Sequence, residues 1–128
     1  SLPSLIKAQR IQEKAAGIGF DWKTAEEVWS KVQEELFELK VELQKGSQSK
    51  IEEEFGDFLF SMVNYARFLN IESDSVLEKA NQKFTKRLLF IENCAKEKGK
   101  SISELSNSEL NNLWLEAKNY DSLEDDSS

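Results

Sequence analysis

Apolar residues recur along the chain at the three-to-four-residue spacing of amphipathic helices, and glycine and serine separate the helical segments. The pattern predicts five helices, over about residues 4–16, 24–45, 51–69, 75–98 and 106–118. Capping boxes, in which Ser or Thr is followed three residues later by Glu, support the starts at Thr24, Ser75 and Ser106. The expected fold class is therefore all-α, a bundle of about five helices.

The ends of the chain differ in character. Residues 1–120 are expected to form a single domain, because no linker long enough to divide them is visible. Residues 121–128, DSLEDDSS, are acidic and polar, and we expect a disordered tail there.

Charge and composition exclude several classes of protein. The 128 residues carry a net charge of −7, which argues against a nucleic-acid polymer as partner, because phosphate backbones need a basic surface. No apolar run is long enough to cross a membrane, and the first residues lack a signal-peptide pattern, so a cytoplasmic protein without a membrane partner is expected.

The absence of histidine narrows the possible chemistry further. Ser-His-Asp triads, Cys-His dyads and HExxH zinc sites all need a residue that this chain lacks. No glycine-rich phosphate loop is present either. Carboxylate chemistry remains, and hard oxygen ligands suit Mg²⁺ or Mn²⁺.

The two central helices each place a pair of acids beside their apolar stripe. In EELFE, Glu35 borders the stripe and Glu38 follows three positions later; in EFGD, Glu54 and Asp57 repeat this spacing. Four clustered carboxylates repel one another, and a divalent cation would compensate them. From spacing alone, ordinary surface charges on amphipathic helices explain these acids equally well.

The second predicted helix is apolar on two sides. Phe37 and Val41 lie opposite its main apolar stripe, which indicates a dimer or another helical layer.

The fourth predicted helix carries a basic stripe that includes Lys83 and Arg87. Such a stripe is by itself more often a solvated charged face. Asn81 lies nearer the apolar side of the same helix.

Aromatic residues can either pack in the core or stack on a nucleobase. Trp114, with Lys118 four positions later, is core from its pattern alone, although a tryptophan face also stacks on nucleobases. Phe20 and Trp22 are interpreted as packing residues.

The segments EELFE and EFGD resemble the EExxE and ExxD signature of the MazG family of all-α nucleoside triphosphate pyrophosphohydrolases. The resemblance extends from QEKAAGIGFDW through EEEFGDFLFSMVNYAR and KANQKFTKR to LWLEAK, nearly the whole chain up to about Lys118. It is strongest to the catalytic C-terminal domain of two-domain MazG proteins.

The resemblance implies hydrolysis of a nucleoside triphosphate to the monophosphate and pyrophosphate, with Mg²⁺ as cofactor and Mn²⁺ able to replace it. It also implies a MazG-like bundle with the site between helices, completed as a homodimer, and broad tolerance of the base. The metal ligands and catalytic residues it implies are Glu35, Glu38, Glu54 and Asp57. The substrate-binding residues it implies are Lys83, Arg87, Trp114 and Lys118, with Glu34 and Asn81 as supporting residues.

Two other functions stay open at this point. One is a narrower enzyme of the same superfamily, a dUTP, dCTP or phosphoribosyl-ATP pyrophosphatase. The other is a helical dimerisation or regulatory module without catalysis, which predicts no metal-dependent binding of nucleotides.

Overall fold

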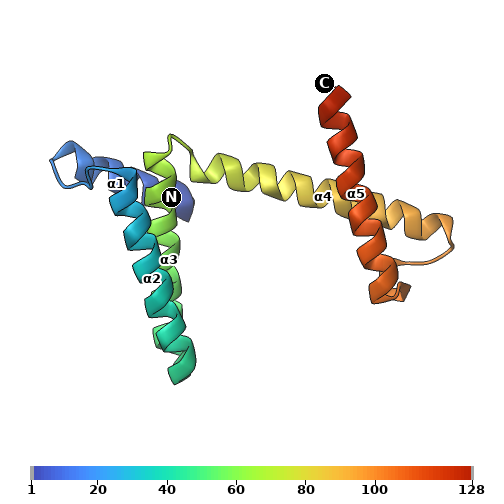
Figure 1. The fold of residues 1–128 in the computed structure, drawn as a ribbon, viewed down its shortest axis with the longest axis horizontal. Coiled ribbons are helices and arrows are strands. Elements are labelled where there is room, and N and C mark those ends of the chain that lie inside the picture. Colours follow the sequence, from blue (N-terminus) through green and yellow to red (C-terminus); the bar gives the residue numbers. More distant parts are fainter. Residues whose placement is uncertain (1, 128) are drawn as a thin grey trace. The chain divides into compact units, whose positions relative to one another are not determined.

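The computed structural model describes residues 2–127, and each element of secondary structure in this range is a helix (Figure 1). The elements are α1 (Ser4–Gly17), α2 (Ala25–Lys45), α3 (Gln48–Phe68), α4 (Ser73–Glu97), the 3₁₀ helix η1 (Ile102–Glu104) and α5 (Asn107–Ser127). Residues 2–127 contain no strand, which confirms the all-α fold class. None of the helices in this range is long and apolar enough to cross a membrane.

Two of the predicted helix starts have the expected N-cap hydrogen bond, and one of them has the complete capping box. The Thr24 hydroxyl accepts from the Glu27 backbone N–H at 3.2 Å and begins α2. Ser106 and Glu109 form the full reciprocal box before α5, with both N–H to side-chain oxygen distances at 3.1 Å. Helix starts set by such local hydrogen bonds are readable from sequence, because the partners lie three residues apart.

The start of α4 differs from its prediction. The helix begins at Ser73, and Ser75 lies in its first turn, where the hydroxyl donates to Glu72 Oε2 at 3.1 Å. The predicted helix start at Ser75 is therefore wrong, because α4 begins two residues earlier and Ser75 is not at its N-cap.

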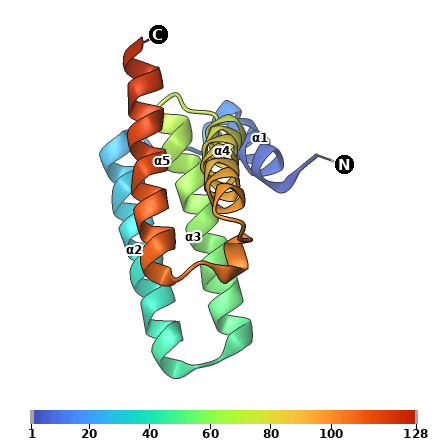
Figure 2. The same cartoon turned by 90° about the vertical axis from the view of Figure 1, so that its right-hand side faces the viewer.

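The chain divides into two compact units, residues up to Leu77 and residues from Glu78 onward. In the first unit, α2 and α3 run side by side as an antiparallel pair (Figure 2). Gly46 ends α2 at φ +77°, and its N–H donates to the Glu42 carbonyl at 3.0 Å. This left-handed conformation suits glycine and turns the chain toward α3.

The buried stripe of α2 consists of Val28, Val32, Glu35 and Leu39. Leu36 and Leu43, which follow Val32 and Leu39 at helical spacing, are nevertheless more than a third exposed. Helix α1 packs on α3, where Gln12 Nε2 donates to the Phe60 carbonyl at 3.0 Å.

The second unit has its core between α4, η1 and α5. Ile91 and Ala95 of α4 pack with Leu105 and Leu113. Helix α5 continues through Ser127, so residues 121–127 are helical where the sequence predicted a disordered tail. One contact from a distant part of the chain supports this helical end, because the Asp121 carboxylate accepts from Arg87 Nε on α4 at 2.6 Å. Residue 128 lies outside the described residues, and the single domain expected over residues 1–120 stays a prediction.

Candidate metal centre

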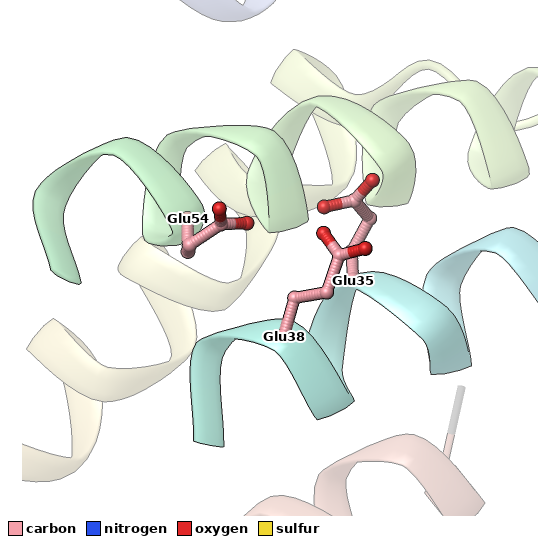
Figure 3. Close-up of side chains that lie close together, drawn as sticks. All are labelled: Glu35, Glu38 and Glu54. Atoms are coloured by element: carbon pink, nitrogen blue, oxygen red, sulfur yellow. The ribbon is translucent and has the colours of Figure 1, made fainter. Parts of the chain in front are cut away.

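Three of the four predicted acids meet between α2 and α3. Glu35, Glu38 and Glu54 each offer one carboxylate oxygen, and these oxygens all lie within 4.8 Å of one another. Figure 3 shows Glu35 and Glu38 extending from α2 toward Glu54 on α3. Oxygens that share one Mg²⁺ at about 2.1 Å lie at most about 4.2 Å apart. Small side-chain movements would therefore let all three ligate one cation.

The electrostatics of this group call for positive charge. Glu35 is only 6% exposed, and its Oε1 lies 2.9 Å from Lys31 Nζ. The second oxygen of Glu35 and Oε2 of Glu54 are buried without a hydrogen-bond partner among the described residues. Removal from water raises the pKa of Glu54, and the neighbouring charges of Glu38, Asp57 and Glu35 raise it further. Because buried carboxylate oxygens without partners are costly, these residues fit a divalent cation.

Asp57 and Glu34 lie at the edge of the acid group. Asp57 is exposed, one turn after Glu54 on α3, and it does not belong to the three acids within mutual reach. Its charge nevertheless acts on Glu54. Glu34 is exposed too, with its Oε1 3.8 Å from Lys31 Nζ.

Lys31 is a site residue that the sequence analysis missed. Its hydrogen bond to Glu35, together with the charges of three nearby glutamates, raises the pKa of the Lys31 ammonium group. It supplies the positive charge nearest to the acids. The signal was available, because Lys31 precedes Glu35 by four residues on the same helix.

The predicted substrate-binding residues lie in the second unit. The Arg87 guanidinium carbon lies 5.2 Å from the centre of the Trp114 ring, and Arg87 Nε lies 2.6 Å from Asp121 Oδ2. The Phe84 ring also contacts Trp114, with ring centres 5.4 Å apart. Trp114 is thus partly buried by two neighbours, as its apolar pattern indicated.

The remaining two predicted substrate-binding residues and the supporting residue Asn81 are exposed. Lys83 and Lys118 have their side chains open to solvent, which suits cations that are meant to meet phosphates. Asn81 is exposed as well, as are Leu77 and Phe84 in the same part of α4, so its expected place nearer the apolar side stays a prediction. The buried part of that helix starts later in the chain, toward Ile91.

The loop before α2 also differs from expectation. Phe20 is 81% exposed, and Trp22 is partly exposed, so the loop aromatics are not simple core residues. Both line an open cavity of about 420 Å³ between α1, this loop and α3.

The fold and the site thus define an all-α protein with a group of carboxylates, on two neighbouring helices, that could hold a metal ion. Comparison with known proteins identifies the family to which this chain belongs. Residues 23–100 match the MazG nucleotide pyrophosphohydrolase domain. The chain therefore belongs to the MazG family, as the resemblance of its motifs predicted.

Two relatives illustrate the likeness. The chain is 44% identical over 120 residues to the nucleoside triphosphate pyrophosphohydrolase/pyrophosphatase MazG of Thermotoga maritima, a match that covers 94% of this chain and 46% of the relative. It is 38% identical over 120 residues to the nucleoside triphosphate pyrophosphohydrolase of Escherichia coli K12, covering 92% of this chain and 46% of the relative. The chain thus spans about half the length of the curated relatives it matches.

Proposed function

We propose that this chain hydrolyses nucleoside triphosphates, including deoxynucleoside triphosphates, to the monophosphate and pyrophosphate, with Mg²⁺ as the cofactor. One observation carries the proposal in a MazG-family chain: carboxylates of Glu35, Glu38 and Glu54 within 4.8 Å of one another. Two of these three residues have buried oxygens that lack a hydrogen-bond partner among residues 2–127. The narrower pyrophosphatases remain the alternative enzymes.

The four acids are assigned two roles, metal ligation and acceptance of a proton, according to their positions. Glu35, Glu38 and Glu54 would hold the cation from both helices, with Asp57 completing the set. When bound, a divalent cation offsets the charge of the phosphate oxygens and polarises the phosphorus toward attack. Asp57 is the most exposed and least engaged of the four, so we assign it to accept the proton of the attacking water. Attack at the α-phosphorus breaks its bond to the bridging oxygen and releases pyrophosphate.

Lys83, Arg87, Trp114 and Lys118 are proposed to bind the substrate, as the family resemblance implies, with Glu34 and Asn81 in supporting roles. Arg87 is held between Asp121 and Trp114 and so presents a fixed cation. The exposed ammonium groups of Lys83 and Lys118 are free to follow the phosphates.

A homodimer in the cytoplasm completes the proposal. Several large apolar side chains on α2 and α3 are exposed in the single chain, Phe37 at 67% above all, with Leu43 and Phe55 about half exposed. A second copy would cover such a surface, because monomers rarely expose so much apolar area.

The test is pyrophosphate release from a panel of ribo- and deoxyribonucleoside triphosphates with Mg²⁺. We expect pyrophosphate and monophosphate in equal amounts, and their loss with EDTA and in Glu54→Gln. Glu53→Gln, which changes the exposed neighbouring acid, is the matched control and should keep the activity. A flat profile across the panel would favour broad base tolerance, and a single dominant substrate would favour a narrower enzyme. Absence of turnover by the folded, Mg²⁺-supplied protein would support the non-catalytic module instead.

A further inference from the structure

The cavity beside the GIGFDW loop has the size and lining of a small-molecule site. Its volume is about 420 Å³, and small-molecule pockets measure roughly 300–1,000 Å³. The apolar walls come from three segments: Ile11 on α1, Phe20 and Trp22 in the loop, and Phe60 on α3. Each of these four side chains is at least two-fifths exposed, so apolar surface remains to be covered.

One polar group in the lining lacks a partner. Gln12 is only 6% exposed, and its Nε2 donates to the Phe60 carbonyl at 3.0 Å. This bond fixes which end of the amide is the acceptor. Its Oε1 is buried and has no hydrogen-bond partner among residues 2–127. Buried acceptors are nearly always satisfied, so a ligand with an N–H donor suits this wall.

The loop that carries the two aromatic walls is held firmly. Arg67 on α3 binds Asp21 through two hydrogen bonds, at 2.6 and 3.1 Å. The same guanidinium reaches Asn64 Oδ1 at 2.8 Å, and the Trp22 N–H donates to Asp21 at 2.9 Å. The walls are therefore positioned before any ligand arrives, which lowers the ordering cost of binding.

Helix α3 connects this cavity to the acids. Phe60 follows Asp57 by three residues, so the two share neighbouring positions on one side of the helix. At 1.5 Å per residue, Phe60 lies about 9 Å along α3 from Glu54. Six residues turn through about 600°, so Phe60 also lies about 120° around the helix axis from Glu54, with the exposed Asp57 between them. A ligand with its phosphates at the acids would pass over Asp57 to place a flat ring at Phe60.

We propose that this cavity receives the nucleobase of the nucleotide, with Phe20 and Trp22 as its aromatic walls and Gln12 Oε1 accepting a base N–H. The proposal rests on the proposed function, because it places the base of that same substrate. A ring N–H or exocyclic amino group occurs on every common base, so this contact agrees with broad base tolerance.

The test compares Phe20→Ala with Ile18→Ala. Ile18 belongs to the same loop and is 83% exposed, but it does not line the cavity. Calorimetry with Mg²⁺ would measure the Kd of an α,β-methylene nucleoside triphosphate, which cannot be cleaved at that bridge, and of inorganic tripolyphosphate, which has no base. We expect Phe20→Ala to weaken nucleotide binding roughly tenfold, the scale of one lost base-stacking contact, and to leave tripolyphosphate binding unchanged. Ile18→Ala should change neither Kd by more than about twofold.

The outcomes separate this proposal from the proposed function. Equal nucleotide Kd values for the two variants, or equal weakening of both ligands by Phe20→Ala, would overturn the base site. Pyrophosphate release by the wild-type protein would leave the enzymatic function intact in either case. No release across the nucleotide panel would instead remove the function on which the base site depends.

Discussion

Lys31 Nζ lies 2.9 Å from Glu35 Oε1, which makes a lysine the nearest positive charge to a carboxylate that is almost completely buried. The pair joins residues four apart on α2, and the other oxygen of Glu35 remains without a partner among the described residues. A bound cation and Lys31 therefore compensate the same acid group. This relationship gives the first prediction.

Lys31→Met should destabilise the metal-free protein by about 1–2 kcal/mol, because Glu35 loses its charged hydrogen-bond donor. Saturating Mg²⁺ should restore much of that loss, since the cation supplies the missing positive charge. Urea unfolding in EDTA and in Mg²⁺ measures both values. Lys40→Met, at an exposed position of the same helix, is the control and should have little effect. A loss of equal size in both buffers would contradict shared compensation of the acids.

Mg²⁺ should raise the stability of the wild-type protein, because it binds the folded acid group and the unfolded chain has no such group. At a concentration of 100 times Kd the gain is about 2.7 kcal/mol. Thermal unfolding with increasing Mg²⁺ or Mn²⁺ would show a rising Tm. Glu54→Gln should lose most of this rise, and Glu52→Gln, at an exposed position of α3, should retain it. Equal Tm shifts in the two variants would exclude Glu54 as a ligand.

Asp21 should contribute stability that depends on pH. The hydrogen bonds from Arg67 are the main cause that lowers the pKa of Asp21. A carboxyl whose pKa is lower in the folded state contributes fully above its unfolded pKa of about 3.9, and loses the contribution as pH falls through the folded value. Asp21→Asn should therefore cost about 1 kcal/mol between pH 5 and 7, and this cost should shrink below about pH 4. Urea unfolding at pH 7, 5 and 3 measures it; a cost that stays constant down to pH 3 would disprove the linkage.

Gly46→Ala should destabilise the protein by about 1–2 kcal/mol, because φ +77° brings a Cβ atom close to the following carbonyl oxygen. Gly17→Ala is the matched control, since Gly17 ends α1 without a positive φ and a Cβ there meets nothing within 4 Å. The control should be neutral or slightly stabilising. Chemical unfolding of both variants provides the comparison, and similar ΔG values would show that the turn after α2 relaxes without strain.

Much of this fold was readable from the sequence because its signals are local. Thr24 and Ser106 cap their helices through residues three positions away, and Gly46 marks the end of α2. The Glu35 and Glu38 pair was likewise predicted from spacing alone. Family resemblance added the function that these patterns left open.

The unpredicted features depend on neighbours that are distant in the chain. Glu35 lies inside the buried stripe of α2 and not at its border, because α3 packs against that side of α2. Leu36 looked equally suitable for the core but faces outward in the single chain. The exposure of Phe20 depends on how α1 and α3 approach its loop. Helical periodicity predicts which residues share one side of a helix. Which element packs against that side, and so which of these residues are buried, depends on the tertiary structure.

The turn at Gly46 also affects how this centre forms. The four acids lie between residues 35 and 57, on two helices joined by a turn of two residues. Contacts between segments so close in the chain require little loop closure, and proteins rich in them fold fast. The α2–α3 hairpin can therefore assemble early in folding and bring together acids that repel one another. A cation present at that stage would stabilise the hairpin and speed its formation, so a bound metal would act on folding kinetics as well as in the proposed hydrolysis.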